Sequence, residues 1–287
     1  MAKDVIIIDN DCLYFLRGDR KQSLYSIAAL HSLRCEDAPM YKREGGEVIL
    51  SEECISSAIK LFQEKLNIRL NEADLILPPA ITWFSYLAVE EMPKTEKEAE
   101  EFIIWKVQKI MPIPREQVIL RYQILSRAKD RGTVLIAATF NNFVKSIENA
   151  FKKMGILVTG LTPPTIAFLN FFEQSLPKNC VLCWLRESSY SMVCLYDGFP
   201  VVIREVDRAV NVKRIEAELF SFVQSVKEGF PDYNFDAVFF FDELQREELV
   251  NNFPETAKKL EYKKFIQESD CNIIDLPKYI SALGIIG

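Results

Sequence analysis

The order strand, strand, strand, helix, strand occurs twice in this sequence and constrains its fold more than any other feature. The first copy lies in residues 4–77 and opens on the apolar strand DVIIID; the second lies in residues 181–241 and closes on AVFFF. Each expected helix carries apolar residues at helical spacing, and the strands are apolar runs bounded by turn residues. A further helix is expected after each copy, over residues 165–176 and 277–286. This repetition of order predicts an α/β fold built from two similar halves.

Two connections in the first copy are expected to be irregular. Gly18 and Asp19 have the composition of a turn between the second and third strands. Residues 34–46 are polar and contain Pro39 and a Gly-Gly pair, so we expect a surface loop there.

A compact α+β module separates the two copies. Residues 96–111 place apolar side chains at helical spacing behind an acidic first turn, and residues 118–124 and 133–140 have the pattern of a strand hairpin. A second amphipathic helix follows from Asn141 or Asn142, and Gly155 is suited to cap its end. Residues 81–89 are expected to form the strand that opens the module.

The amino-acid sequence of residues 96–172 resembles that of a known family. The stretch has a helix that stops at Pro112 and Pro114, then the strands VILRYQIL and VLIAAT, an amphipathic helix, and MGILVTGLTPPTIAFLNFF. In this it is similar to the PilM family of type IV pilus assembly proteins, and more distantly to the cytoplasmic domain of the type II secretion protein GspL. The resemblance implies an actin-like, duplicated ribonuclease H-like fold related to FtsA, with an FtsA-like α+β subdomain inserted in its first half.

The resemblance also implies a division of the chain. The first actin-like half would comprise residues 1–80 with 155–178, the inserted subdomain residues 81–154, and a reduced second half residues 179–287.

Composition narrows the partners and the compartment. The net charge of −6 and the pI of about 5.2 argue against nucleic acid, whose phosphates need clustered Lys and Arg. No apolar run approaches the roughly 20 residues that span a bilayer, so direct membrane insertion is not expected. Residues 1–4 lead directly into a strand rather than into a signal peptide, which indicates a cytoplasmic protein.

The cysteine and histidine content argues against a metal site. Seven cysteines scattered through apolar segments are typical of a reducing compartment. Cys180 and Cys183 have CxxC spacing, but residues three apart on a strand point to opposite faces, so we expect structural thiols. The single histidine, His31, is expected to be structural, and no nucleotide-binding or hydrolase motif is present.

The resemblance implies an Asp-x-Gly hairpin for nucleotide phosphates in each half. In the first hairpin Asp9 is retained, but Asp11 places a carboxylate where glycine is expected and would repel a phosphate. In the second hairpin Trp184 and Arg186 stand at the Asp and Gly positions, and the glycine pair expected after the later strand is replaced by Phe241-Asp242 or a neighbouring pair. We therefore expect a pseudo-ATPase without cofactor or metal.

Two alternatives remain open at this stage. Arg186, Ser188 and Ser189 could recruit phosphate through their side chains, which would make the chain an ATP-binding actin-like assembly protein whose nucleotide regulates partner binding. A divergent sugar-kinase-like enzyme is less favoured, because phosphoryl transfer needs a catalytic carboxylate beside well-formed phosphate loops.

The function implied by the resemblance is that of a scaffold. It would serve a type IV pilus or type II secretion inner-membrane platform, peripheral to the membrane, and hold the cytosolic tail of a bitopic, PilN-like protein between the first half and the module. The assembly ATPase is a second candidate partner.

The helix at 96–111 is the expected contact. Its apolar surface is broadened beyond one face by Ile104, Trp105, Gln108 and Met111. We expect Trp105 or Met111 at the wall of the partner groove, and the alternative is that Ile104 and Trp105 pack inside the module.

Overall fold

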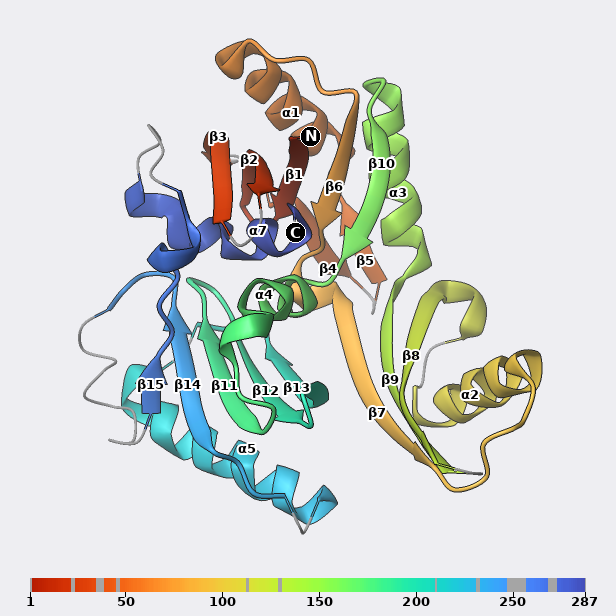
Figure 1. The fold of residues 1–287 in the computed structure, drawn as a ribbon. Coiled ribbons are helices and arrows are strands. Elements are labelled where there is room, and N and C mark those ends of the chain that lie inside the picture. Colours follow the sequence, from red (N-terminus) through yellow and green to blue (C-terminus); the bar gives the residue numbers. More distant parts are fainter. Residues whose placement is uncertain are drawn as a thin grey trace.

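The computed structural model describes residues 2–21, 24–34, 39–44, 47–111, 114–128, 131–209, 211–230, 233–246, 257–267 and 273–286. Pro112 and Asp130, at two predicted turns, lie outside these ranges, as do Cys35 and Cys271. Figure 1 shows two large sheets, one above the other, and a smaller sheet to one side.

The first sheet has the strand order β10-β6-β1-β2-β3. Strands β1, β2 and β3 form an antiparallel meander, and β6 and β10 add in parallel beside β1. The bounds are β1 Lys3–Ile8, β2 Cys12–Lys21, β3 Leu24–Arg34, β6 Glu72–Ile76 and β10 Leu157–Thr162.

The second sheet, β13-β12-β11-β14-β15, has the same topology. Its bounds are β11 Cys180–Leu185, β12 Tyr190–Tyr196, β13 Phe199–Val206, β14 Ala237–Asp242 and β15 Ala257–Lys259. The two similar halves that the repeated order predicts are therefore confirmed.

Alternation along the buried strands divides the interior into separate cores. On β1, Val5 faces the space between the two sheets, whereas Ile6 and Ile8 face outward. On β11, Cys180 and Trp184 face the same central space, and Cys183 faces the outer core. The CxxC cysteines thus lie on opposite faces as predicted, and both are free and buried.

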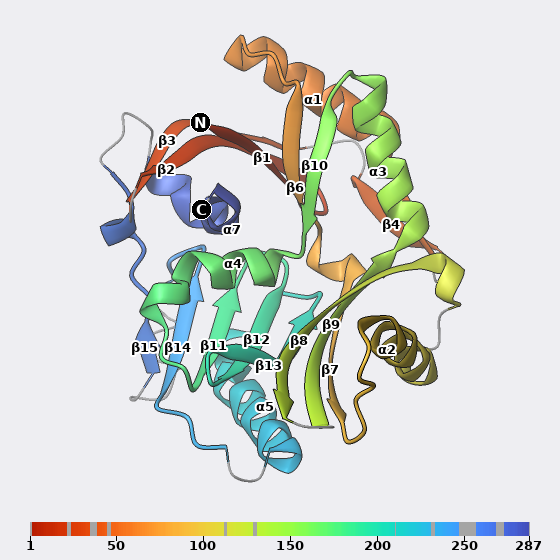
Figure 2. The ribbon, with the colours of Figure 1, turned by 45° about the vertical axis from the view of Figure 1, so that its right-hand side comes forward.

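Helices cover the outer faces and fill the centre. Helices α1 Glu52–Leu66 and α3 Asn141–Lys153 pack on the first sheet, and α5 Ile215–Gly229 packs on the second. Helices α4 Pro164–Phe172 and α7 Ile280–Ile286 lie between the two sheets (Figure 2). Short 3-10 turns complete the described chain: η1 Pro79–Ile81, η2 Arg115–Gln117, η3 Glu173–Ser175, η4 Val212–Arg214, η5 Lys263–Phe265 and η6 Ile273–Tyr279.

A third sheet, β7-β9-β8, forms the module between the copies. Its strands are β7 Thr82–Val89, β9 Arg131–Phe140 and β8 Val118–Ala128, and α2 Glu96–Ile110 packs on one face around Ile103. Thr95 caps α2 by accepting a hydrogen bond from the Glu98 backbone at 3.3 Å. The third sheet is thus closed on one face by its own helix.

Helix α3 behaves differently from α2. The proposed division places it in the inserted module, yet Phe143 and Phe151 are buried in the core of the first sheet, beside α1. At its end Gly155 has a φ of 73° and donates a backbone hydrogen bond to Lys152, which confirms the predicted glycine cap. The exact division at residue 154 stays a prediction.

Both connections that were predicted to be irregular differ in the structure. Gly18 and Asp19 form no turn, since β2 continues to Lys21 and Gly18 sits at a shift in the β2–β3 register. A Cβ at Gly18 would lie 2.7 Å from the Ser26 carbonyl oxygen, so glycine allows a close strand approach there. Residues 34–46 are not simply a loop, because Tyr41–Glu44 pairs as β4 with β5 Glu47–Leu50. Met40 anchors this hairpin in the first core.

Replacing Gly284 by Ala should strongly destabilise the fold. A Cβ there would lie only 1.8 Å from the Ala167 carbonyl oxygen of α4, so the two central helices must move apart. We expect a loss of about 3 kcal/mol in unfolding free energy, in the upper range for overpacking, measured by urea unfolding. Gly160→Ala is the control, because its Cβ would meet only the carboxylate of Asp74, which can move. Equal stability of the two variants would contradict a tight α4–α7 crossing.

Candidate functional site

The inner ends of β1 and β11 meet in a cleft between the two halves. Asp9 follows β1, Arg186 follows β11, and Glu243 follows β14. The space left between them is only about 30 Å³, close to the volume that one molecule occupies in liquid water. The structure therefore brings together Asp9, Trp184 and Arg186, which the sequence had assigned to the two phosphate hairpins.

Trp184 fills much of this cleft. Its ring stacks on Phe168 of α4 at 4.3 Å between centroids, and the Arg186 guanidinium carbon lies 4.2 Å from the indole centroid. The indole Nε1 donates a 3.0 Å hydrogen bond to Oε1 of Glu243. The side chain is held by an aromatic ring, a cation and a carboxylate, so it is fixed in place across the cleft.

Arg186 is the centre of a buried polar network. Its Nη2 lies 2.9 Å from Oε2 of Glu205 and its Nε donates to Ser189 Oγ at 2.7 Å. Ser191 Oγ donates to the same Glu205 oxygen at 2.6 Å, and Thr165 of α4 bonds both Ser191 and Glu205. Of the three guanidinium nitrogens of Arg186, Nη1 is the one that is buried without a hydrogen-bond partner among the described residues. The side chains of Arg186 and Ser189, which the ATP-binding alternative assigns to phosphate, thus form hydrogen bonds to other protein groups.

The remaining hairpin residues lie at the rim. Ser188 is exposed, and Asp11 pairs with Arg34 at 3.4 Å. Arg34 also contacts Glu187 at 3.4 Å, so it bridges the hairpins of the two halves. This bridge is solvent-exposed and contributes little stability.

The sequence reasoning missed Glu243 and Glu205. Glu243 directly follows a buried parallel strand, at the sheet edge where functional groups gather, and this position was a usable signal. Glu205 lies near the end of β13, where nothing in the local pattern distinguishes it from a solvated charge. Asp242, the residue before Glu243, accepts a hydrogen bond from the Arg246 backbone N–H at 2.6 Å and forms an ion pair with the Arg246 guanidinium. These contacts fix the start of the loop after β14.

Two carboxyl groups in the cleft have perturbed pKa values. Burial raises the pKa of Asp9, a shift that its hydrogen bond from Asn10 and the Arg186 charge oppose. Burial also raises the pKa of Glu243 well above its ordinary value, and Arg186 again opposes the shift. Both groups therefore favour the protonated form more than a free carboxyl does.

The structure offers no clustered ligands for a metal ion: among the described residues no group of three His, Cys, Asp or Glu side chains converges on one point. His31 packs edge-on against Phe62 at 5.4 Å between ring centroids, which is a structural contact.

A larger groove lies between the module and the first half. It has a volume of about 560 Å³. Strands β8 and β9 form one side, and β10 with α3 forms another. Its lining includes the small residues Ala137, Ala138 and Gly160, and the charges at its lining are Arg121 and Glu148. A groove at this place was expected, but neither Trp105 nor Met111 lines it.

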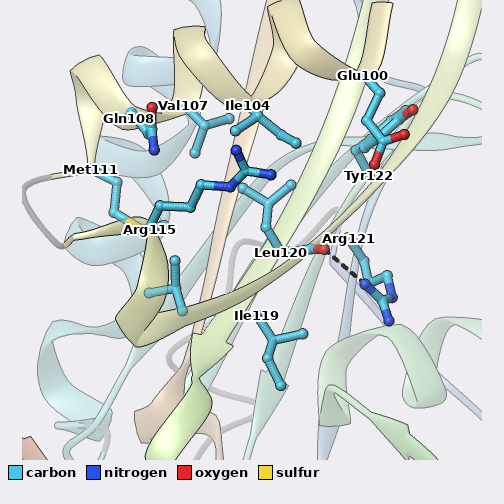
Figure 3. Close-up of a pocket in the computed structure, with 11 residues that line it drawn as sticks. Glu100, Ile104, Val107, Gln108, Met111, Arg115, Ile119, Leu120, Arg121 and Tyr122 are labelled. Atoms are coloured by element: carbon cyan, nitrogen blue, oxygen red, sulfur yellow. Dashed lines mark hydrogen bonds between the residues drawn. The ribbon is translucent and has the colours of Figure 1, made fainter. Parts of the chain in front are cut away.

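The four predicted contact residues of α2 are divided between a second cavity and the surface. Ile104, Gln108 and Met111 line a cavity of about 370 Å³ between α2 and β8 (Figure 3). Trp105 lines neither cavity. It is 47% exposed, and Lys109 Nζ lies 3.6 Å from the indole centroid. The alternative that Trp105 packs inside the module therefore does not hold.

Comparison with known proteins gives structural neighbours only. No family model and no curated protein matches the sequence. Among solved structures, the PilM–PilN type IV pilus biogenesis complex contains a chain with a TM-score of 0.75 and 17% identity, over 99% of this chain and 97% of that chain. The cytoplasmic domain of EpsL, an inner-membrane component of the type II secretion system of Vibrio cholerae, has a TM-score of 0.56 and 10% identity, covering 99% and 95%.

A Bacteroides thetaiotaomicron protein with an actin-like ATPase fold and unknown function has a TM-score of 0.53 and 12% identity, covering 99% and 95%. With the two five-stranded sheets, these likenesses define the class: the chain has the actin-like fold. Within that class its fold is similar to the pilus chain over nearly its whole length, so the predicted PilM-like resemblance is confirmed at the level of fold.

No helix among the described residues is both long and apolar enough to cross a membrane.

The raised pKa values of the cleft predict a pH dependence. A carboxyl whose folded pKa is raised contributes stability below its unfolded pKa of about 4, and this contribution is lost as pH rises through the folded value. Glu243→Gln keeps an acceptor for the Trp184 indole but cannot ionise. As pH rises from about 4, the unfolding free energy of the wild type should fall relative to that of the variant, because only the wild type loses this contribution. Thermal unfolding at several pH values measures the difference, with the exposed Glu53→Gln as control. A pH-independent difference would contradict the raised pKa.

Proposed function

We propose that this chain is a cytoplasmic scaffold of a type IV pilus or type II secretion inner-membrane platform, and that it binds the cytosolic tail of a PilN-like bitopic membrane protein. Two observations support the proposal: the fold is similar to PilM, in a complex with PilN, and to the EpsL cytoplasmic domain. The observation that carries it is the groove between the module and the first half. The chain would be peripheral to the membrane through this partner.

The groove suits an extended segment better than a compact ligand. Its walls come from β8, β9, β10 and α3, so strands form most of its lining. Ala137, Thr159 and Gly160 leave room for side chains of the tail, and Leu77, Val144 and Leu161 offer apolar contacts. A short extended tail would gain main-chain hydrogen bonds and a few buried side chains there.

We further propose that the chain is a pseudo-ATPase without a bound cofactor. The groups at the nucleotide position are bonded to one another: Trp184 to Glu243, and Arg186 to Glu205 and Ser189. Admitting a nucleotide would break these contacts, and separating a buried ion pair costs about 3–5 kcal/mol. The retained Asp9 is the residue that supports the alternative, an ATP-regulated assembly protein. The exposed face of α2 around Trp105 remains available for a second partner such as the assembly ATPase.

Magnesium ATP should leave the melting temperature unchanged. Binding at 100-fold excess over the dissociation constant would stabilise the fold by about 2.7 kcal/mol, which differential scanning fluorimetry detects easily. The double variant Trp184→Gly, Arg186→Gly is the comparison, because it removes the two side chains that fill the cleft. A thermal shift in the wild type that disappears in Asp9→Ala would overturn the pseudo-ATPase proposal and favour the alternative.

Filling the groove should weaken tail binding without unfolding the protein. Thr159 is an exposed residue of β10 that lines the groove, so Thr159→Trp should weaken binding of the PilN-like tail by at least about tenfold, or 1.4 kcal/mol. Leu157→Trp is the matched control, because Leu157 lies on the same strand, is 64% exposed and does not line the groove. Fluorescence anisotropy with a labelled tail measures both variants.

Trp105→Ala separates the two candidate surfaces in the same assay. The sequence reasoning expects Trp105 at the partner site, whereas the structure places it outside the groove. If Trp105→Ala weakens binding and Thr159→Trp does not, the tail binds on the exposed face of α2 instead.

A further inference from the structure

Strand β8 forms one end of the third sheet. The order β7-β9-β8 leaves its outer edge without a strand partner among the described residues. Such an edge presents unpaired backbone N–H and C=O groups that can accept another strand. The question is what this edge is shaped to accept.

The two cavities lie on either face of this edge. All five residues of the segment from Val118 to Tyr122 line the cavity below α2, whereas only Ile119 and Arg121 line the groove on the opposite face. This division follows from strand alternation: Val118, Leu120 and Tyr122 point toward the α2 core, and Ile119 and Arg121 point away from it (Figure 3). The free edge of β8 therefore runs between the two cavities.

We propose that the partner tail binds as a fourth strand on the free edge of β8, with successive side chains entering the groove and the α2 cavity in turn. This inference rests on the proposed function and specifies its geometry. An added strand has the same two-residue alternation as β8, so its side chains alternate between the two faces. Cavities of about 560 and 370 Å³ receive them.

The charges at this edge define the chemistry of the segment. Arg115 and Arg121 are both exposed beside the α2 cavity, and within the described part of the chain neither forms an ion pair. Each cavity also has one carboxylate at its lining, Glu100 on α2 and Glu148 on α3, whereas the charged side chains within the segment 118–122 and in the turn before it that line these cavities are the two arginines. Arg121 donates only to the carbonyl of Leu120, at 3.2 Å. A carboxylate on the tail would pair with these guanidinium groups. The expected tail segment thus alternates apolar residues and carries an acidic residue near its middle.

A second copy of this chain fits the edge poorly. In a symmetric antiparallel pairing of two β8 edges centred between residues 118 and 121, the arginines of one copy would lie near those of the other, and like charges across strands are destabilising. The arrangement favours a different, acidic partner.

Two experiments with the full chain test this inference. Synthetic peptides that tile the cytosolic tail of the PilN-like protein from the same organism are measured by fluorescence anisotropy. In the peptide that binds with the highest affinity, each backbone nitrogen is methylated in turn. Strand addition predicts a period of two: methylation at nitrogens that face β8 weakens binding about tenfold each, the equivalent of one hydrogen bond, and methylation between them has less than about twofold effect.

The second experiment reverses charge. Arg121→Glu and Arg115→Glu should each weaken the acidic peptide about tenfold, and replacing the peptide's acidic residue by Lys should restore binding to these variants. Arg69→Glu, an exposed arginine after α1, is the control and should have no effect.

The outcomes separate the inference from the proposed function. If a peptide binds and Thr159→Trp blocks it, but methylation shows no period of two, strand addition is wrong while the scaffold proposal stands. If no tail peptide binds, both fail. If light scattering shows a dimer that Arg121→Glu alters, the edge belongs to a second copy and the inference is overturned.

Discussion

The contact on which the rest of the structure depends is the crossing of α4 and α7 between the two sheets. With the Ala167 carbonyl so close to Gly284, the helices pack backbone against backbone, and only glycine permits that separation. Each helix also contacts a sheet: Leu283 and Ile280 pack toward β1 and β2, while Phe168 and Phe172 pack toward β11 and β14. The crossing therefore fixes the distance between the halves, and with it the size of the cleft. A cleft held this narrow can be filled by side chains alone, which is how Trp184 comes to span it.

The cleft between the two halves of this actin-like fold is closed by bonds between side chains. In this cleft the side chains of Trp184 and Arg186 are bonded to carboxylates from neighbouring strands. The Arg186–Glu205 pair is almost fully buried, so its value lies less in net stability than in the penalty for separating it. Thr165 of α4 forms a hydrogen bond to Glu205 of this pair. The network therefore extends from the second half to α4, the helix that follows the last strand of the first half. The polar network and the crossing of α4 and α7 thus both hold the two halves together.

Sequence reasoning predicted the parts of this fold that depend on local pattern. The repeated element order, the module and the Gly155 cap all follow from periodicity and turn chemistry, and they are present. It failed where a residue's role depends on a distant neighbour: Gly18 resembles a turn residue but serves a close strand contact with Ser26. In the site, Asp9 and Arg186 could be located through their hairpins, whereas Glu205 is distinguished only by tertiary contacts. Trp105 was expected at the groove wall and lies outside it, because helical spacing shows that a residue is off the core stripe but not which neighbouring element it faces.

The position of α7 has a consequence for how the chain reaches its native state. This helix is formed by residues 280–286, yet it completes the inner face of the sheet that begins at Lys3. During synthesis, the inner side chains of β1 and β2 therefore remain without their cover until nearly three hundred residues have been joined. Contacts so distant in sequence are slow to form and expose apolar surface in the meantime. A ribosome-bound chain should consequently need protection of its first sheet from aggregation, and the two halves should acquire their final packing together rather than one after the other.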